Sequence, residues 1–529
     1  MSENILYDEK AREALLAGID KLADAVRCTL GPKGRNVAFD QKYDVPLVTN
    51  DGVTIAKQVE LEDPHENMGA NVIKTAAIKT NETVGDGTTA SVVLTRAIVK
   101  EGVKNVVAGA NPVILNKGIN KAYEVAIKEI DKISRPVKDK NDVKQIAKIS
   151  GNNDEFIGDM ISDAFDKVGL NGAVTIEDSQ QLETVLNYSN GVSFTNGYLS
   201  PHFINNENNK SADLDKPYVL LYQDRIKNFK DIVKVLEETA QKGVSLLIIA
   251  QDVEESALKT LALNVSRGVL KAAAVKCPGY GDTRKRNMKA LALVLNGTVI
   301  TDETGLKLEN CGLEVCGRAD RAVVEKENTI IQNPAGADSE EVKIMIKQVR
   351  DTLKDTKEDY EIEKLQNTLA MLQGGLALIT VGGTSELEMF ERKYRMEDAI
   401  NAVYASAEQG VVPGGGQALI WAAPAVDKLI ETLAGDEKTG AKIVRDALEA
   451  PMRQIAENAG VDASVVVDKV MNSNDVNFGF NALTGEYADL LEAGVIDPAK
   501  VIKSSLTSAV SSATMLLTTE ASVHQPEKH

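Results

Sequence analysis

The segment Gly85-Asp86-Gly87-Thr88-Thr89 combines residue types that can bind a phosphate group. Hydrophobic spacing predicts that it lies where a turn enters a helix, so free backbone N–H groups and the positive end of the helix dipole would point at one spot. Gly87 would let a phosphate approach the backbone, the threonines add hydroxyl donors, and Asp86 offers a hard oxygen for Mg²⁺. Taken alone, however, so short a segment is more typical of a helix N-cap made by the Asp or a Thr.

Three further turns offer chemistry of the same kind. Thr29-Leu30-Gly31-Pro32 is a glycine turn at a helix end, and Asn50-Asp51-Gly52 is a tight turn that presents a carboxylate. The run 411–416, Val-Val-Pro-Gly-Gly-Gly, would let a ribose or an adenosine lie against bare backbone. Each turn alone is typical of an ordinary loop, but together they favour a nucleotide site. The chain has no Walker loop, since Gly31-Pro32-Lys33-Gly34 has the wrong spacing and no hydroxyl follows it.

Helices must position the first of these turns, and an α/β segment follows them. Apolar spacing predicts helices over 8–30, over 64–83, from the Gly85–Thr89 turn to near 109, and over 118–133. The middle of the chain alternates short buried strands (218–222, 244–250, 271–275, 298–300) with helices (228–243, 254–268), which indicates a largely buried sheet. Two charged helices over 338–373 come next, and the last ~120 residues return to helix.

Composition excludes several classes of protein. The chain has 529 residues, 43% of them hydrophobic and 26% charged, which is typical of a globular protein with several domains. A net charge of −18 disfavours binding to nucleic acid, and no apolar run reaches the ~18 residues of a membrane span. The start, Met1–Asn4, is acidic and no apolar signal core follows, so we expect a cytoplasmic protein. Cysteines at 28, 277, 311 and 316 match no zinc pattern and are expected to be plain thiols.

Several motifs resemble the group I chaperonins, the GroEL family, from about residue 5 to residue 520. They are TLGPKGRNV (29–37), NDGVTIAK (50–57), ELEDPHENMGA (60–70), GDGTT (85–89), NGYLSPHF (196–203), PGYGD (278–282), VVPGGG (411–416) and VIDP (495–498). The resemblance implies a multidomain fold that combines α and α/β parts. It would have a helical equatorial ATPase domain (1–132 and 409–529), a small α/β intermediate domain (133–189 and 377–408) and an α/β apical domain (190–376), with hinges at Pro136, Gly191, Gly374-Gly375 and Gly410.

The resemblance also assigns roles at the nucleotide site. Asp398 and Asp51 match the acids that orient the attacking water, and Asp86 matches the Mg²⁺ ligand. Thr29, Asn50 and Thr89 match positions near a bound K⁺. The remaining matched nucleotide contacts are Leu30, Gly31, Pro32, Gly87, Thr88, Ala90 and Gly415, with Asn481, Ala482, Leu483 and Asp497 at the adenine and ribose. Because Asp398 is far from the other acids in sequence, we expect a hinge to close before hydrolysis.

In the α/β segment, the resemblance implies contacts with unfolded clients and with a co-chaperonin. The matched positions are Tyr198, His202, Phe203, Val233, Leu236, Leu258, Ala262, Leu263 and Asn264. The alternative is that the aliphatic members are ordinary core, since Leu258, Leu261, Ala262 and Val265 share one helical stripe. Leu263 lies off that stripe and is expected to be exposed.

The chain departs from the family at several positions. Asn50 stands where Lys is usual and Ala90 where a third Thr is usual, so hydrolysis could be slower. Leu483 replaces Ala beside the base, and His202 replaces Tyr. The chain ends Gln525-Pro526-Glu527-Lys528-His529, without a Gly-Met tail.

Three functions are compatible with these features. The first is an ATP-dependent chaperonin, using ATP, Mg²⁺ and K⁺, that forms heptameric rings, stacked in pairs as a tetradecamer and capped by a GroES-like co-chaperonin. The second is a divergent paralogue with weak ATPase that acts as a scaffold or holdase. The third is a small-molecule ATP enzyme, for which the sequence offers no substrate motif.

Overall fold

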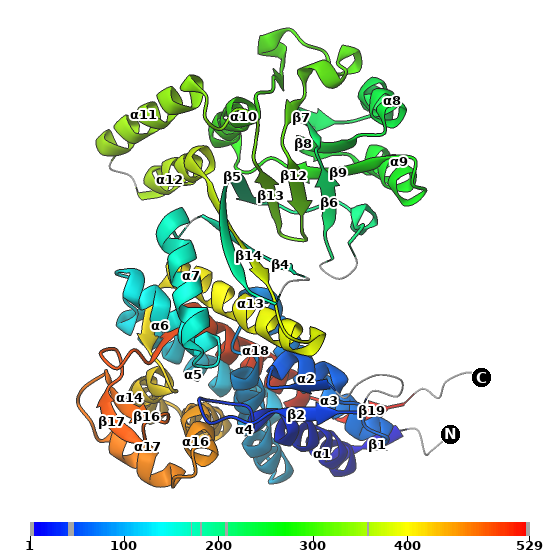
Figure 1. The fold of residues 1–529 in the computed structure, drawn as a ribbon. Helices are drawn as coiled ribbons and strands as arrows, with labels where there is room; N and C mark the ends of the chain where they lie inside the picture. The colour runs from blue at the N-terminus through cyan, green and yellow to red at the C-terminus, as the bar shows by residue number, and fades with distance from the viewer. Residues whose placement is uncertain are drawn as a thin grey trace. The chain divides into compact units, whose positions relative to one another are not determined.

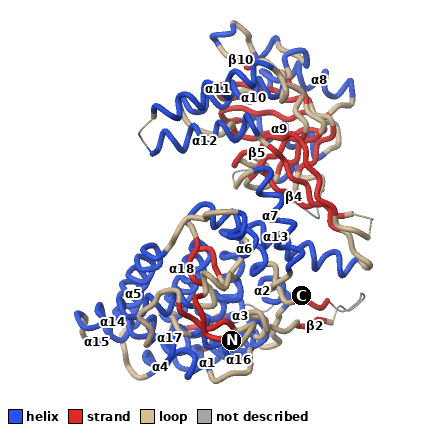
Figure 2. Tube along the Cα trace, turned by 60° about the vertical axis from the view of Figure 1, so that its left-hand side comes forward, coloured by secondary structure: helices blue, strands red, loops and turns tan. Residues whose placement is uncertain are grey.

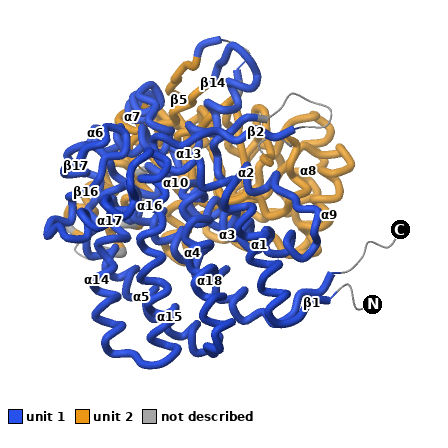
Figure 3. The backbone as a smooth tube through the Cα atoms, turned by 90° about the horizontal axis from the view of Figure 1, so that it is seen from below, with its two compact units in different colours: residues 1–163, 178–183, 381–529 blue, residues 164–177, 184–380 orange. Residues whose placement is uncertain are grey.

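The structure is a computed structural model that describes residues 5–40, 47–170, 172–179, 182–206, 210–356 and 359–524. The chain divides into two compact units (Figure 3). One comprises residues 1–163, 178–183 and 381–529, and the other comprises 164–177 and 184–380. The finer three-domain division stays a prediction. The expectations for Met1–Asn4 and for residues 525–529 fall outside the described residues.

The first unit is a layer of long helices (Figure 1). The central ones are α1 (Asp8–Arg27), α3 (Pro64–Val84), α4 (Thr88–Val107), α5 (Pro112–Ile133), α15 (Gly435–Ala447) and α18 (Ala499–Leu517). α1 packs on α3 and α4, and α18 packs on α3, α4 and α5 around an aliphatic core. All four helices expected in this part of the sequence are present. The fourth begins at Pro112, not at 118, because the Asn111 side chain accepts hydrogen bonds from the N–H groups of Val113 and Ile114 and so caps the helix there.

In the part of the chain that the structure describes, further helices and four small sheets complete this unit. The helices are α2 (Gly52–Gln58), α6 (Lys140–Ser150), α7 (Glu155–Val168, which continues into the second unit), α13 (Glu386–Gln409), α14 (Gln417–Thr432), α16 (Ala450–Asn458) and α17 (Ala463–Met471). The sheets are two-stranded. Two join distant segments, β1 (Ile5–Tyr7) with β19 (Ala521–Val523) and β15 (Val411–Pro413) with β18 (Ile496–Pro498), and two join neighbouring ones, β2 (Val37–Phe39) with β3 (Leu47–Thr49) and β16 (Phe478–Asn481) with β17 (Glu486–Asp489). α6 and α13 pack against each other.

The second unit contains the predicted buried sheet, and its longer strands are drawn in red in Figure 2. β10 (Val299–Ile300), β7 (Tyr218–Ile226), β8 (Ser245–Val253) and β9 (Lys271–Lys276) lie in that order and are parallel, as the strand–helix alternation predicts. A short strand, β11 (Gly317–Arg318), pairs antiparallel with β7. The helices are α8 (Val233–Lys242), α9 (Glu255–Ser266) and α10 (Gly281–Leu295), and α8 and α9 lie together on one side of the strands (Figure 1).

A six-stranded sheet in the same region was not predicted. Its order is β4 (Ala173–Asp178), β14 (Gly375–Val381), β5 (Val185–Thr195), β13 (Asn328–Gln332), β12 (Arg321–Val324), β6 (Ala212–Asp215). β5 pairs with β14 up to Asn190 and with β13 from Gly191 onward. Its sequence, VLNYSNGVSFT, is rich in Asn, Ser and Gly, so its tendency to form a strand comes from pairing on both edges and not from apolar periodicity.

The remaining elements agree with the sequence pattern. The two charged helices are α11 (Glu340–Asp355) and α12 (Asp359–Gln373). All four cysteines are free thiols, of which three are buried and Cys28 is half-buried, as expected. Among the described residues, no helix is both long enough and apolar enough to cross a membrane.

Candidate nucleotide site

Two glycines with positive φ shape the Gly85–Thr89 turn. Gly85 ends α3 with φ +69°, and Gly87 begins α4 as its N-cap with φ +76°. No side chain caps α4, so the alternative in which an Asp or a Thr caps this helix is wrong. Asp86 and the two threonines are therefore available for other chemistry. A Cβ at Gly87 would lie 2.6 Å from Ser505 Oγ, so the loop is held closely against α18.

The first turn of α4 offers hydrogen-bond donors to a ligand. The first bond of the helix runs from the Ser91 N–H to the Gly87 carbonyl (3.0 Å), so the N–H groups of Thr88, Thr89 and Ala90 have no acceptor within the helix. Thr89 Oγ1 lies 3.2 Å from Thr29 Oγ1, and a Cβ at Gly52 would collide with the Thr89 hydroxyl. The segment after α1, the start of α2 and the start of α4 therefore meet, as a phosphate site requires.

Asp51 is the N-cap of α2. Its carboxylate accepts hydrogen bonds from the N–H groups of Val53 (3.2 Å) and Thr54 (2.9 Å). Asp51 therefore caps α2, a common role for an acid that directly precedes a helix. The same carboxylate also interacts electrostatically with Asp86 and with Asp398.

Asp86 is half-buried, and both of its carboxyl oxygens are bonded. Oδ1 accepts from the Gly87 N–H, and Oδ2 accepts from Ser150 Oγ at 2.7 Å. Burial raises the pKa of the Asp86 carboxyl group, the two hydrogen bonds oppose that shift, and the charge of Asp51 adds to it.

Asp398 lies on α13 and is also half-buried. Desolvation is the largest cause that raises its pKa well above the usual range, followed by the charges of Asp86, Asp51 and Glu397. The three acids come from distant parts of the sequence, and their charges interact in this structure, while the hinge closure expected before hydrolysis stays a prediction. Concentrated negative charge of this kind is stabilised by a cation.

The donor set fits a hard cation such as Mg²⁺, since it consists of carboxylate and hydroxyl oxygens. Within the described ranges, however, no three His, Cys, Asp or Glu side chains are grouped closely enough to bind a metal ion between them. A metal at this position would therefore have Asp86 as its protein ligand and would complete its shell with phosphate and water oxygens, as Mg²⁺ commonly does.

The glycine run 414–416 lies beside Asp497 because β15 pairs with β18. Val412 is opposite Asp497 in this ladder, and the Gly414 N–H donates to the Val495 carbonyl (2.9 Å). A Cβ at Gly414 would lie 3.0 Å from Asp497 Oδ1. Burial, with a smaller effect from Asp86, raises the pKa of Asp497 to about 7, although the Gly415 N–H bond opposes the shift.

A cavity that opens to solvent lies next to these groups, and about 370 Å³ of empty space, adjoining solvent included, falls within it. Most of its lining is apolar, and Asp497 and Ser505 provide the polar side chains. A flat base against apolar walls with a carboxylate near a ribose is a common arrangement in nucleotide sites. The lining residues are Leu30, Ala90, Leu94, Gly416, Leu419, Pro451, Ile455, Asp497, Ile502 and Ser505.

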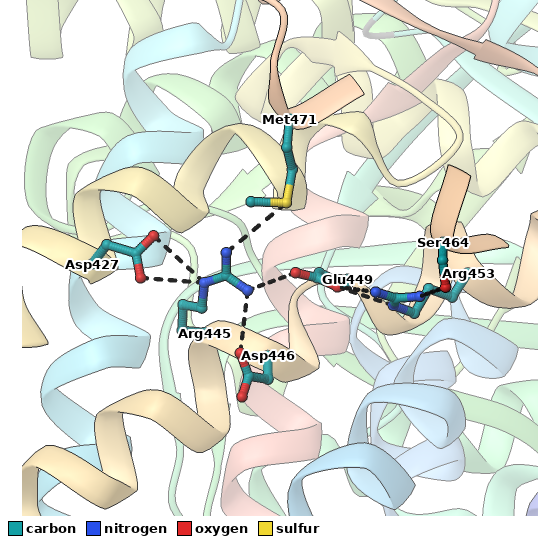
Figure 4. A network of polar contacts seen from close by, with 7 residues as sticks. All are labelled: Asp427, Arg445, Asp446, Glu449, Arg453, Ser464 and Met471. Carbon is teal, nitrogen blue, oxygen red and sulfur yellow. Dashed lines mark hydrogen bonds and ion pairs between the residues drawn. The ribbon is translucent and has the colours of Figure 1, made fainter. Parts of the chain in front are cut away.

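A polar network holds the helices that form one wall of this cavity (Figure 4). Glu449 is buried and accepts from Arg445 Nη1 (2.6 Å) and from Arg453 Nη2 (2.7 Å). Arg445 also pairs with Asp427 of α14, and Arg453 donates to Ser464 of α17. A buried carboxylate between two guanidinium groups is well compensated, so α14, α16 and α17 are fixed relative to one another.

The other predicted nucleotide contacts are more dispersed. Ala482 is buried in a small core with Ile420 and Met452, and Asn481 Oδ1 accepts from the Leu483 N–H (3.1 Å). Leu483 is 49% exposed and does not line the cavity. Asn50 is half-buried and immediately precedes Asp51. Gly31 lies close to Ile455, since a Cβ there would be 3.2 Å from that side chain, and Pro32 follows in the same turn.

The predicted client contacts in the second unit differ in exposure. Phe203, Leu236 and Ala262 are buried in the α/β core, which is the alternative that the sequence left open. Tyr198, Val233, Leu258 and Asn264 are half-buried. His202 is exposed, and Leu263 is 49% exposed, as its position off the helical stripe predicts.

Sequence reasoning missed several residues that contact the loop. They are Ser150, which bonds to Asp86; Ser505, whose hydroxyl donates to the Gly87 carbonyl (3.0 Å); and Asn401, whose side chain a Cβ at Gly85 would strike. Asn458 was also missed, and its amide donates to the carbonyls of Arg27 (2.9 Å) and Leu30 (2.8 Å). Single Ser and Asn residues in helices carry no sequence signal of this role.

The chain belongs to the TCP-1/cpn60 chaperonin family, whose model matches residues 22–526. It is a chaperonin of the GroEL type, and the resemblance inferred from the sequence motifs is confirmed.

Among solved structures, the chain is similar to the chaperonin gp146 from bacteriophage EL (Pseudomonas aeruginosa), crystallised in the presence of ATP-BeFx. In crystal form II the TM-score is 0.76 at 20% sequence identity, with 99% of each chain covered. In crystal form I the TM-score is 0.67 at the same identity and coverage. At this identity the similarity concerns the fold, which is helical plus α/β as predicted.

Proposed function

We propose that this chaperonin binds and hydrolyses ATP at the Gly85–Thr89 loop and uses the cycle to bind and encapsulate non-native proteins for folding. The observation that supports this most strongly is the meeting of Asp51, Asp86 and Asp398 around the unsatisfied N–H groups at the start of α4. The start of α4 offers N–H groups with no acceptor in the helix, and Gly416, which precedes α14, lines the cavity, so both helix N-termini favour an anion.

Each group has a chemical role in this proposal. The N–H groups and hydroxyls of Thr88 and Thr89 hold phosphate oxygens, and the apolar cavity takes the adenosine, with Asp497 near the ribose. Asp398 accepts a hydrogen bond from the attacking water and places it in line with the γ-phosphate, and Asp51 assists. Mg²⁺ held by Asp86 would neutralise phosphate charge. K⁺ near Thr29, Asn50 and Thr89 is part of the same proposal.

Client binding belongs to the second unit. Leu263 is the exposed aliphatic member of the predicted set, and Val269, nearby in the sequence, is 57% exposed. Repeated around a ring, such residues would present an apolar rim to unfolded chains. We propose homo-heptameric rings, stacked in pairs as a tetradecamer, capped by a GroES-like co-chaperonin and acting in the cytoplasm, also under stress.

A second candidate is a scaffold or holdase with weakened ATPase. It is favoured by Ala90, which lines the cavity with a methyl group where a hydroxyl would otherwise be available, and by the lack of a cation at Asn50.

Steady-state ATP turnover in the presence of Mg²⁺ and K⁺ tests the proposal, with the variant Asp398→Ala beside the unmodified protein. Asp398→Ala should keep ATP binding and lose most of its turnover, about 10²-fold or more, because water is no longer oriented. No turnover by the unmodified protein would favour the scaffold function. Equal turnover by both proteins would refute the role of Asp398.

A further inference from the structure

Ser150 is the last residue of α6, and its hydroxyl group reaches the nucleotide loop from a distant part of the sequence. Its Oγ donates a hydrogen bond of 2.7 Å to Oδ2 of Asp86. The other oxygen, Oδ1, accepts from the Gly87 N–H. The Asp86 carboxylate is therefore oriented by one backbone bond from its own loop and by one side-chain bond from another helix.

This arrangement leaves Asp86 able to bind a cation. A carboxylate has about four lone-pair positions, and these two hydrogen bonds use two of them. Carboxylates that bind metals are commonly held by outer hydrogen bonds that fix their rotamer, and loss of such a bond costs about 10–100-fold in metal affinity. The Ser150 bond has the geometry of such an outer contact.

The helix that carries Ser150 contacts the elements that carry Asp398 and Asp497. α6 packs against α13, which carries Asp398, and also against β18, which includes Asp497. α13 contacts the loop as well, since a Cβ at Gly85 would strike Asn401. A movement of α6 would thus change the support of Asp86 and the surroundings of Asp398 together.

We propose that Ser150 is a positioning residue that orients Asp86 for the divalent cation of the bound nucleotide and thereby links metal affinity to the position of α6. This inference rests on the proposed function, because it assumes that the site binds a nucleotide with Mg²⁺. By thermodynamic linkage, metal binding at Asp86 must in turn stabilise the end of α6.

The test measures binding of a fluorescent ADP to the full chain while Mg²⁺ is titrated, and then repeats the measurement in EDTA. Ser150→Ala should raise the Mg²⁺ concentration at half-effect by about 10–100-fold and leave binding in EDTA unchanged. Ser150→Thr, which keeps the hydroxyl, should restore most of the effect. Ser266→Ala is the matched control, since Ser266 also ends a helix but donates to the Ala262 carbonyl in the other unit.

Two further measurements separate orientation from mere support of the fold. On an Asp86→Asn background, Ser150→Ala should cause no additional change in the Mg²⁺ response, because the two residues act through one contact. Amide hydrogen exchange should show that Mg²⁺ with ADP protects the last turn of α6 in the unmodified chain, and that this protection is lost in Ser150→Ala.

The outcomes are distinguishable. An unchanged Mg²⁺ midpoint in Ser150→Ala, or an equal loss of ADP binding in EDTA, would overturn the role of Ser150 while leaving the nucleotide site intact. If the unmodified protein binds no ADP with Mg²⁺, the proposed function itself fails. Thermal unfolding of each variant shows whether the fold is retained, and Ser150→Thr provides a second reading if Ser150→Ala does not fold.

Discussion

Single carboxyl groups decide much of the electrostatics of the candidate nucleotide site. Asp86, Asp398 and Asp497 are half-buried, and each has a raised pKa whose first cause is desolvation. Burying such groups costs stability, and that cost is characteristic of functional sites, where charge is arranged for a ligand and not for the folded chain alone.

The clearest consequence at this scale concerns Asp497. Its carboxyl group keeps its proton up to a pH of about 7 in the folded protein but loses it near 3.8 in the unfolded chain. Between these values the folded state binds more protons, so the free energy of unfolding contributed by this group should fall as the pH rises. Asp497→Asn should flatten this dependence and stabilise the nucleotide-free protein at pH 8 by on the order of 2–4 kcal/mol.

Urea unfolding of the nucleotide-free protein from pH 4 to pH 8 measures this effect. Glu431→Gln removes an exposed carboxyl group of the same unit and should leave the pH profile unchanged. A steeper pH profile for Asp497→Asn, or a loss of stability at pH 8, would contradict the interpretation.

At the scale of elements, two pairs of connecting segments run side by side at the predicted hinge positions. Arg135 pairs with Val411 through both backbone bonds (3.0 and 2.7 Å), next to Pro136 and Gly410. In the second unit, the Gly191 N–H donates to the Gly374 carbonyl (3.0 Å) where β5 changes partner. The predicted hinge residues therefore occur as adjacent pairs, each inside one of the two units, and their role as hinges stays a prediction.

Gly410 should tolerate no side chain. Its φ is +77°, and a Cβ would collide with the carbonyl oxygen of Arg135. Gly410→Ala should destabilise this unit by about 2 kcal/mol or more, because it adds a steric clash to the unfavourable φ. Gly460→Ala is the matched control, since Gly460 has φ +79° but no atom within 4 Å of the position that a Cβ would take, and it should cost less. The denaturant midpoints of Gly410→Ala and Gly460→Ala measure the two losses of stability. Equal losses would show that the clash with the Arg135 carbonyl does not matter.

At the scale of the whole molecule, the family membership places this chain among proteins that work as rings. In each copy the second unit carries exposed Leu263 on the same helix as fully buried Leu261. In the proposed function the exposed Leu263 contacts a client, whereas the buried Leu261 supports the fold, so substitutions at the two positions should have different consequences.

Leu263→Ser should leave thermal stability and ring formation unchanged and weaken the capture of a denatured client several-fold, because an apolar contact is lost from every subunit. Leu261→Ser should instead lower thermal stability by about 3 kcal/mol, since it places a hydroxyl group and a cavity in the core. Negative-stain imaging checks the rings, and suppression of client aggregation measures capture. If Leu263→Ser captured the client as well as the unmodified protein does, Leu263 would not belong to the client-binding surface.

The sequence alone determined the long helices, the parallel sheet and the identity of the acids and glycines at the site. These features depend on local periodicity and on residue chemistry, and both can be read directly from the amino-acid sequence. Only the tertiary structure showed that Gly87, and no side chain, caps α4, that β5 joins two parts of an antiparallel sheet, and that Phe203, Leu236 and Ala262 are buried.

The tertiary structure also brought Asp398 close enough to Asp86 for their charges to interact, and it brought Ser150 into a hydrogen bond with the Asp86 carboxylate. These contacts join residues far apart in the sequence, and whether such residues meet depends on how helices pack. Packing is decided by the summed fit of many side chains, which no short motif encodes.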